Sequence, residues 1–232
     1  MKTPRLTRRE LLLSAGVAAA SPLLAVDTPE PVTIPANAQE ALLRLQEGNR
    51  RFVEGRTKHA HEGANWRKHL VGGQKPFATI LGCADSRVPV ELVFDQGFGD
   101  LFVVRVAGNV IAPDVIGSLT YAVAHLSTPL IVIVGHEGCG AVTAAVEALK
   151  GNTDELPGIK ALVQLIEPGL PKELPGKSIE EQISAAVEAN VRWSLSELAQ
   201  LPEAQRAIAA GKVTLLGAVY DLRTGAVRFL PT

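Results

Sequence analysis

The sequence contains very little cysteine: Cys83 and Cys139 are the two cysteines among its 232 residues. Two cysteines can form one bridge, but not the disulfide framework of a small secreted domain. No apolar run approaches the roughly 20 residues that a membrane-spanning helix needs. The formal net charge is −1, so the chain lacks the positive excess that favours nucleic acid or an anionic membrane surface. We therefore expect no nucleic acid and, in the mature form, no membrane as a partner.

The overall composition is that of an ordinary globular protein. Hydrophobic residues make up 47% of the chain and charged residues 20%, which argues against intrinsic disorder. A chain of 232 residues is long enough to bury a substantial core and short enough to form one domain. We find no internal repeat, and we expect a single domain over residues 38–232.

The amino terminus has the features of an export signal. Arg8 and Arg9 precede a modestly apolar stretch that runs to about Ala25, an arrangement typical of twin-arginine signals. The alternative is a basic helix with frayed ends. We predict a signal peptide over residues 1–25, whose cleavage position the sequence leaves open, and a proline-rich linker over residues 26–37. Such a protein would act in the periplasm or elsewhere outside the cytoplasm.

Apolar runs alternate with helical segments along the rest of the chain. This pattern predicts an α/β fold with a mostly parallel central sheet of about four strands and helices on both faces. Thr224 and Gly225 form a hairpin-turn signal, so residues 226–230 should return as an antiparallel edge strand. Strands are expected at about 77–82, 101–106, 130–135 and 213–219, and helices at about 89–94, 114–126, 139–150, 180–199 and 202–210.

A long helix should precede the first strand. Asn37 is a good N-cap, and Glu40, three residues later, completes a capping-box pattern. The helical spacing of apolar residues continues to about Gly55. Because this helix lies before the first strand, we expect it to cover another surface, such as that of a partner subunit. Residues 151–177, with prolines and glycines clustered near 168–176, should be the least ordered part of the domain.

Both cysteines follow strand-like runs. Cys83 comes after residues 77–81, and His136 and Cys139 come after residues 130–134. In an open parallel sheet, the residues just past the carboxyl ends of the strands share one crevice. Thiolate and imidazole are the ligands that zinc prefers, so we predict that Cys83, His136 and Cys139 bind one Zn²⁺ ion. The alternative is a Cys83–Cys139 disulfide, which an oxidising compartment would permit.

Asp85 and Arg87 lie on the same loop as Cys83. Asp85 could close the site as a fourth ligand, or it could stand free and accept a hydrogen bond from water on the metal. Arg87, two residues further on, can hold the carboxylate in a bidentate pair and keep it ionised. The alternative is a loop ion pair that contributes little to stability. The place of the pair between the predicted ligands favours a function.

Residues 83–89, 94–97, 100–109 and 135–142 form four motifs. In these motifs, and from about residue 39 to the end, the chain resembles the β-class carbonic anhydrases. The resemblance implies reversible hydration of carbon dioxide to bicarbonate and a proton at one zinc ion. It also implies homodimers or tetramers with the active sites at the subunit interface.

The resemblance assigns roles to individual residues. Cys83, His136 and Cys139 match the zinc ligands, and Asp85 and Arg87 match the catalytic pair. In the family, part of the substrate pocket is typically supplied by the neighbouring subunit. The residues that match or adjoin the substrate-binding positions are Gln74, Phe102, Val106, Gly108 and Tyr121.

Ile80 stands near the position at which the bicarbonate-regulated branch of the family has a tryptophan. We therefore expect the plant-like branch, with an open site and without that allosteric bicarbonate pocket. Four histidines have side chains that could relay a proton to buffer, but each is better explained as a surface or packing residue, and we assign the role to none. They are His59, His61, His69 and His125.

Other functions are compatible with the same residues. A hydrolase of carbon disulfide or carbonyl sulfide would keep nearly the same site, as relatives with that chemistry do. A non-catalytic zinc protein would use Asp85 as a permanent fourth ligand, but Arg87 argues against this because a structural site has no need of a group that draws Asp85 away. A metal-free exported module with one disulfide is the third alternative.

Overall fold

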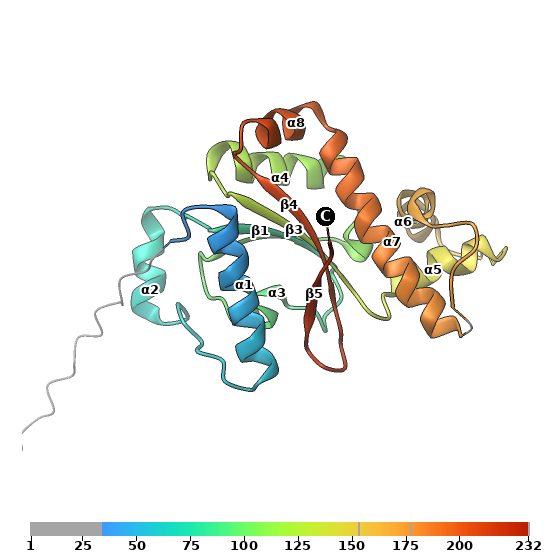
Figure 1. Ribbon diagram of the computed structural model, residues 1–232, viewed down its shortest axis with the longest axis horizontal. Helices are drawn as coiled ribbons and strands as arrows, with labels where there is room; N and C mark the ends of the chain where they lie inside the picture. The colour runs from blue at the N-terminus through green and yellow to red at the C-terminus, as the bar shows by residue number, and fades with distance from the viewer. Residues whose placement is uncertain (1–33, 153, 177, 232) are drawn as a thin grey trace, which may run out of the picture. The chain divides into compact units, whose positions relative to one another are not determined.

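A five-stranded sheet lies at the centre of the domain in the computed structural model, which describes residues 34–152, 154–176 and 178–231. The strand order is β2-β1-β3-β4-β5; the first four strands are parallel, and β5 is antiparallel to β4 (Figure 1). This confirms the predicted fold class. The predicted signal peptide and all of the predicted linker before residue 34 lie outside the described residues. The strands are β1 (Ala78–Gly82), β2 (Leu101–Arg105), β3 (Leu130–His136), β4 (Thr214–Tyr220) and β5 (Val227–Phe229).

Helices cover both faces of the sheet, which explains why the central strands β1 and β3 are buried along their whole length. Alternate residues of β3 point to opposite faces: Ile131 and Ile133 join one core cluster, whereas Leu130, Val132 and Val134 join the other. Helices α4 to α8 pack in the first cluster, and α1 and α3 pack in the second. The helices are α1 (Ala38–Val53), α2 (Ala64–His69), α3 (Val90–Val93), α4 (Pro113–His125), α5 (Gly140–Leu149), α6 (Pro157–Ile166), α7 (Ile179–Gln200) and α8 (Pro202–Ala209), with short 3₁₀ turns η2 (Leu70–Gly72), η3 (Ala107–Asn109) and η4 (Glu167–Gly169).

The described helices include none that is long and apolar enough to cross a membrane.

Helix α1 begins where the sequence predicts. The Asn37 side chain accepts a hydrogen bond from the backbone N–H of Glu40 at 2.9 Å and so caps the helix. Ala41 and Leu45, one turn apart, are fully buried in the same core cluster as Val132 of the central strand. The expectation that α1 covers another surface, such as a partner subunit's, is therefore wrong for its apolar stripe, which packs on the sheet of its own chain.

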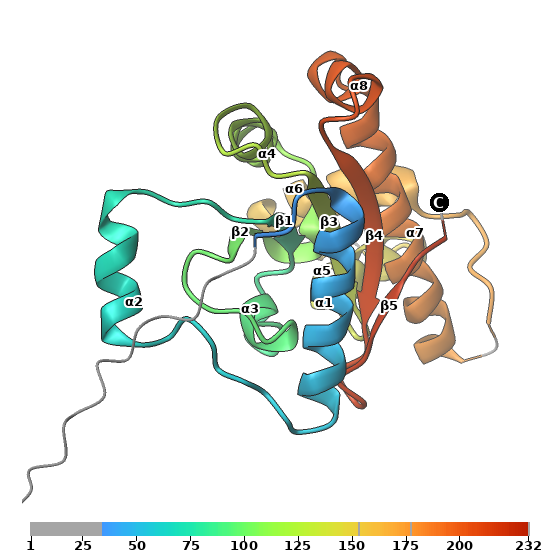
Figure 2. The same cartoon turned by 60° about the vertical axis from the view of Figure 1, so that its left-hand side comes forward.

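The segment from residue 151 to 177 is more regular than predicted. It contains α6 and η4, and the prolines begin these elements: Pro157 and Pro168 occupy first-turn positions, where a missing N–H has no cost. Val163 and Ile166 of α6 are buried in the core beside α5 and α7. Helix α2 was not predicted either. It buries none of its residues, and Figure 2 shows it standing apart from the sheet.

Two glycines let α7 lie close to the sheet. A Cβ atom at Gly135 of β3 would lie 2.6 Å from one methyl carbon of Val191, and a Cβ atom at Gly217 of β4 would lie 2.8 Å from the other. Side chains at these positions would push the helix away. The close approach brings the polar residues Asn190 and Ser194 of α7 to the loop that follows β2.

Candidate metal centre

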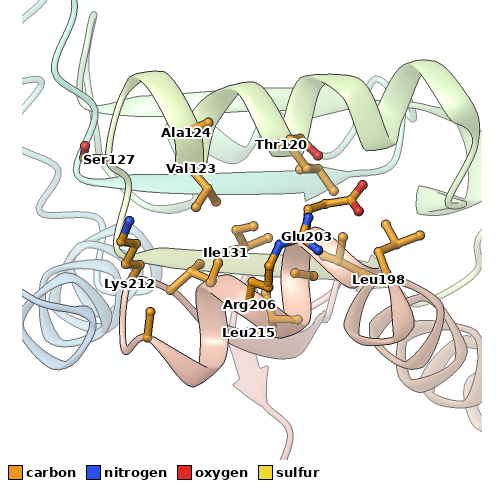
Figure 3. Close-up of a pocket in the computed structure, with 16 residues that line it drawn as sticks. Thr120, Val123, Ala124, Ser127, Ile131, Leu198, Glu203, Arg206, Lys212 and Leu215 are labelled. Atoms are coloured by element: carbon orange, nitrogen blue, oxygen red, sulfur yellow. The ribbon is translucent and has the colours of Figure 1, made fainter.

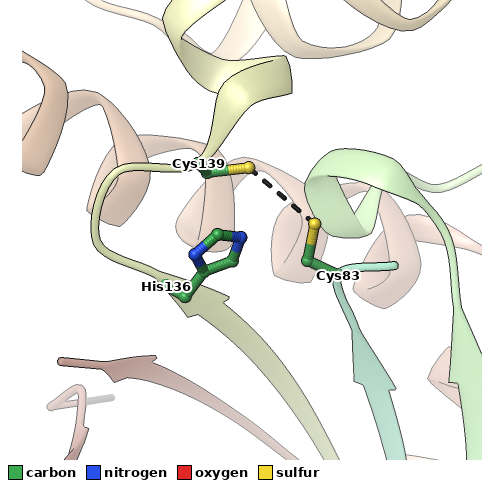
Figure 4. A group of neighbouring side chains, drawn as sticks. All are labelled: Cys83, His136 and Cys139. Atoms are coloured by element: carbon green, nitrogen blue, oxygen red, sulfur yellow. Dashed lines mark hydrogen bonds between the residues drawn. The ribbon is translucent and has the colours of Figure 1, made fainter. Parts of the chain in front are cut away.

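The predicted zinc ligands come together at the carboxyl ends of two adjacent strands. Cys83 directly follows β1, His136 is the last residue of β3, and Cys139 is the N-cap of α5. Gly82 pairs with Val134 in the sheet register. The chain passes from β1 to β2 on one side and to β3 on the other, so this edge is a topological switch point, where open α/β sheets bind ligands. Figure 4 shows the three side chains pointing toward one another.

The distances between the donor atoms fit one tetrahedral metal ion. The two sulfur atoms and a ring nitrogen of His136 all lie within 4.8 Å of one another. The two sulfur atoms are 3.9 Å apart, and two sulfurs bound to one zinc at tetrahedral angles would be about 3.8 Å apart. Both cysteines are free and buried, so the alternative of a Cys83–Cys139 disulfide is not formed.

The orientation of His136 also favours a metal. The ring is fully buried, and its Nδ1 donates a hydrogen bond to the backbone carbonyl of Glu137 at 3.0 Å. In the neutral imidazole this leaves a lone pair on Nε2. Nε2 has no hydrogen-bond partner among the described residues. A buried nitrogen without a partner costs free energy, and a metal ion held with the two sulfur atoms would satisfy it.

The two thiols share one hydrogen bond, which separates their acidities. The hydrogen bond from the Cys139 thiol, with a further one from the backbone N–H of Gly108 at 3.4 Å, holds the pKa of Cys83 well below its usual range. The same pairing, together with burial, raises the pKa of Cys139, because its ionisation would place a second negative charge beside the first. A divalent cation between the sulfur atoms would favour ionisation of both. The donor set therefore fits zinc.

Arg87 holds Asp85 by three hydrogen bonds. Its Nε and its backbone N–H both donate to Oδ1 at 2.9 Å, and a terminal guanidinium nitrogen donates to Oδ2 at 2.7 Å. These bonds hold the pKa of Asp85 well below its usual range, so the carboxyl is ionised at neutral pH. Oδ2 lies 3.8 Å from Nε2 of His136. The ionised carboxylate thus stands beside the donor atoms and is paired with Arg87.

Arg105, at the end of β2, supports the same loop and was not singled out from the sequence. Its Nε donates to the backbone carbonyl of Cys83 at 3.0 Å, and a terminal nitrogen donates to that of Asp85 at 2.6 Å. One guanidinium therefore fixes the backbone at both ends of the Cys83–Asp85 segment. The available signal was a lone charge in an otherwise apolar strand, Val103-Val104-Arg105-Val106.

The predicted substrate-binding residues fall into two groups. Gly108 donates its N–H to the Cys83 sulfur, and Val106 packs in the core cluster that contains both cysteines. Phe102 pairs with Thr79 of β1 in the sheet register, four positions before Cys83, which places it about 13 Å from that residue along the strand. The Tyr121 ring, about half exposed, lies 6.2 Å from the Phe102 ring. This aromatic pair therefore lies toward the opposite end of the strands from its own chain's metal centre.

Gln74 is exposed on the loop between η2 and β1, before the amino end of that strand. It therefore also lies toward the opposite end of the sheet from the three donor atoms.

The four remaining histidines make local contacts away from the three donor atoms. His59 contacts Thr57 and Glu62, and the His61 ring pairs with Asp100 at 2.8 Å. His69 and His125 lie against Trp66 and Tyr121, respectively.

A groove of about 580 Å³ between α4 and α8 contains none of the predicted site residues. Figure 3 shows side chains from both helices directed into it. Its lining is mainly aliphatic and includes Leu119, Val123, Ile131, Leu198 and Leu215. The groove reaches the amino-terminal ends of β3 and β4, away from the metal centre.

Comparison with known proteins agrees with this geometry. The sequence model of the family described as "Carbonic anhydrase" matches residues 78–227. "Carbonic anhydrase 2" of Mycobacterium tuberculosis is 43% identical over 199 residues, which cover 84% of this chain and 92% of that protein. The carbonic anhydrase of Mycolicibacterium smegmatis is 39% identical and covers 83% of this chain and 93% of its own length.

Solved structures show the same fold. The β-carbonic anhydrase of Coccomyxa, solved in complex with acetazolamide, has a TM-score of 0.66 and 28% identity, and the match covers 82% of this chain and 86% of that one. A tetrameric β-carbonic anhydrase of Sordaria macrospora has a TM-score of 0.63 and 26% identity, with 72% and 86% covered. The buried Cys-His-Cys donor set at the switch point of the sheet agrees with the matched family model, the similar sequences and the similar structures. The chain therefore belongs to the carbonic anhydrase family and to its β class.

Proposed function

We propose that this protein catalyses the reversible hydration of carbon dioxide to bicarbonate and a proton, using one zinc ion. The observation that supports this most strongly is a buried triad of Cys83, His136 and Cys139 whose His136 Nε2 is unpartnered among the described residues, beside a carboxylate that Arg87 keeps ionised. The relatives named carbonic anhydrase support the same activity.

Cys83, His136 and Cys139 would hold the metal. A bound zinc ion supplies a water molecule whose pKa is low enough for it to act as a nucleophile near neutral pH. Two thiolates largely neutralise the charge of the ion, so the water is acidified less than it would be by three neutral histidines. The hydrogen bond from His136 Nδ1 to the Glu137 carbonyl fixes the ring with Nε2 toward the site.

Asp85 would assist as a hydrogen-bond acceptor for that water. Its carboxylate, 3.8 Å from His136 Nε2, is placed to accept a hydrogen bond from the attacking water and to orient it. Arg87 keeps this carboxylate ionised and would hold it back from a bound metal. Release of Asp85 by Arg87 would let Asp85 serve as a fourth ligand and close the site, so this pairing also sets the resting state.

The substrate pocket, as we propose it, is completed by a second copy of the chain. Val106 and Gly108 lie beside the donor atoms, whereas Gln74, Phe102 and Tyr121 lie toward the other end of the strands. An aromatic pair with a half-exposed tyrosine fits a surface that another subunit covers. This arrangement supports homodimers or tetramers with interfacial active sites.

The experiment that tests the activity combines zinc analysis with stopped-flow hydration of carbon dioxide at alkaline pH. We expect about one zinc per chain and rapid hydration that a chelator abolishes. Cys139→Ser, which removes one thiolate, should lose both zinc and hydration, and retention of both would contradict the assignment. Zinc without hydration would refute it as well, and the same preparation should then be assayed with carbonyl sulfide and carbon disulfide.

We also propose that the protein belongs to the plant-like branch. Ile80 is fully buried in the core on β1, near the position at which the regulated branch has a tryptophan. Bicarbonate should therefore act only as a reactant of the reversible reaction and not as a regulator, and hydration should follow simple saturation. Cooperative inhibition by bicarbonate would contradict this.

Export by the twin-arginine route is a further proposal, based on Arg8, Arg9 and the apolar stretch that follows them. Because this route carries folded proteins, zinc could be bound before export. Replacing both arginines with lysine should leave the protein in the cytoplasm in cell fractionation, at unchanged total amount. Export of that variant would exclude the route.

A further inference from the structure

Helix α7 is joined by two hydrogen bonds to the turn beside the metal centre. Asn190, 1% exposed, donates from Nδ2 to the backbone carbonyl of Gly108 at 2.8 Å. Ser194, one turn later and equally buried, donates from Oγ to the carbonyl of Asn109 at 3.2 Å. The two side chains therefore hold two successive carbonyls of η3.

This turn has a conformation that needs support. Gly108 and Asn109 have φ angles of 69° and 45°, both in the left-handed region. Glycine adopts this region freely, but for asparagine it is less common and must be stabilised by the surroundings. A Cβ atom at Gly108 would lie 2.8 Å from Ile166 and 3.2 Å from Ala141, so the turn is also closely packed.

The turn connects α7 to a metal ligand. The backbone N–H of Gly108 donates to the Cys83 sulfur at 3.4 Å, while the carbonyl of the same residue accepts from Asn190. The N–H and the carbonyl belong to the two peptide planes on either side of the Gly108 Cα. Fixing the carbonyl restricts both dihedral angles of Gly108 and so aims its N–H at the sulfur.

The chemistry of Asn190 suggests more than packing. Its Oδ1 is buried without a hydrogen-bond partner among the described residues. Leaving a buried amide oxygen unpaired costs free energy, and an apolar side chain of the same size would avoid that cost. The asparagine is better explained by its one bond to Gly108 than by its contribution to the core.

We propose that Asn190 is a positioning residue for the metal centre: by holding the Gly108 carbonyl, it directs the Gly108 N–H to the Cys83 thiolate. An N–H donor to a ligating sulfur withdraws electron density from it and fixes its direction. Groups that orient a metal ligand in this way typically change metal affinity by about 10- to 100-fold when they are lost. The inference rests on the proposed zinc site.

The test uses cobalt as a spectroscopic substitute for zinc in the full-length protein. In Asn190→Leu, which has a similar volume and no donor, we expect zinc affinity, measured by competition with a chelator, to fall by about 10-fold. The thiolate-to-cobalt charge-transfer band should move to longer wavelength, because the sulfur loses its hydrogen bond. Gly108→Ala, which disturbs the same turn from its other side, should move the band in the same direction.

Leu198→Ala is the matched control, because Leu198 is also buried on α7 but has no bond to the turn. It should lower thermal stability and leave both the zinc affinity and the band unchanged. If Asn190→Leu does not fold, Asn190→Ser, whose hydroxyl is too short to reach the carbonyl, replaces it.

The outcomes separate the two proposals. Wild-type affinity and band position in a folded Asn190 variant would overturn the positioning role while leaving the zinc site intact. Failure of the wild-type protein to give thiolate-to-cobalt bands would overturn the zinc site and this inference with it. A lower affinity with an unmoved band would also count against the positioning role, since general loosening of the site predicts that result.

Discussion

Asp85 is ionised because Arg87 donates three hydrogen bonds to it, and its proposed role depends on that charge. Asp85→Asn keeps the size of the side chain and removes the charge. We expect zinc to remain bound, because the three donor atoms are untouched, and hydration to fall by about 10²- to 10⁴-fold. Stopped-flow hydration normalised to zinc content measures this.

The pKa of Asp85 gives the same prediction a pH dependence. Since that pKa lies well below its usual range, Asp85 stays ionised throughout the neutral and alkaline range. Any rise of wild-type activity with pH would therefore come from another group, and Asp85→Asn should lower the rate at every pH while a rising profile remains. An unimpaired rate would remove Asp85 from the mechanism.

Asp95 is a buried carboxylate, and its effect is on stability. Burial opposes its ionisation, but hydrogen bonds from the Arg51 side chain and from the backbone N–H groups of Lys58 and His59 outweigh burial, so its pKa is lowered. Asp95→Asn keeps the left-handed backbone, which asparagine tolerates. We expect the free energy of unfolding at neutral pH to fall by about 1–3 kcal/mol.

The sign of the pH dependence follows from the lowered pKa of Asp95. Its stabilisation is complete above the unfolded-state pKa of about 3.9 and is lost as pH falls through the lower folded-state value. The difference in unfolding free energy between wild type and Asp95→Asn, measured by urea unfolding, should therefore be constant between about pH 5 and 7, which lies above the unfolded-state pKa. It should shrink in more acidic solution. A difference that grows on acidification would contradict this.

The sequence predicts those site residues that lie together in short motifs. Cys83, Asp85 and Arg87 are close in sequence, and His136 and Cys139 form a second short motif. The supporting contacts could not be found in this way. Arg105 meets the Cys83 carbonyl across 22 residues, and Asn190 meets Gly108 across 82 residues, so each bond depends on how strands and helices pack.

At the scale of elements, the docking of α1 depends on one glycine. A Cβ atom at Gly48 would lie 1.8 Å from the backbone carbonyl oxygen of Phe94, at the end of α3. Alanine would normally favour the helix by about 1 kcal/mol, but backbone cannot yield as a side chain can. We expect Gly48→Ala to lower the free energy of unfolding by about 2 kcal/mol, measured by denaturant unfolding.

Gly63→Ala is the control for this prediction. Gly63 has an ordinary negative φ of −70°, and a Cβ atom there would meet nothing within 4 Å. The same substitution should therefore change stability by about 0.5 kcal/mol or less. Equal losses of stability at both positions would show that the contact between α1 and α3 does not cause the effect of Gly48→Ala.

Patterns within one element predicted most helices and strands, because apolar spacing is a local property. Helix α6 was missed although Leu162, Val163 and Ile166 have helical spacing, since nearby prolines and glycines indicated a loop. Its burial depends on packing against α5 and α7, a tertiary contact that the local pattern does not specify. The predicted packing of α1 was wrong for a similar reason: the apolar stripe of the helix was evident from the sequence, but the surface that it covers was not.

At the scale of the whole molecule, the two ends of the sheet carry different parts of the proposed site. The proposed zinc ligands lie at the carboxyl ends of β1 and β3, whereas Gln74, Phe102 and Tyr121 lie toward the amino ends. One chain therefore cannot place all of them around one substrate. Two chains related by a twofold axis could, since each would present its amino-end residues to the other's metal centre.

This arrangement predicts that two inactive variants restore activity when co-expressed. Cys139→Ser lacks a metal ligand but keeps Gln74, and Gln74→Ala keeps the metal site. In a mixed dimer, one of the two sites would combine an intact metal centre with an intact Gln74, so random pairing should recover about a quarter of wild-type hydration. If Gln74 served its own chain, no site would be complete and activity would stay absent.

A control pair separates true completion from stabilisation by mixing. When Gln74→Ala is co-expressed with Tyr121→Ala, each chain lacks one of the pocket residues that it would present to the other chain. No mixed dimer then contains a complete site, and no recovery should follow. Recovery in this pair would mean that the two residues do not act at one site. Recovery in the pair of Cys139→Ser and Gln74→Ala, without recovery in the control pair, requires that Gln74 and the metal ligands of one site come from different chains. Separate monomers have no means of sharing them.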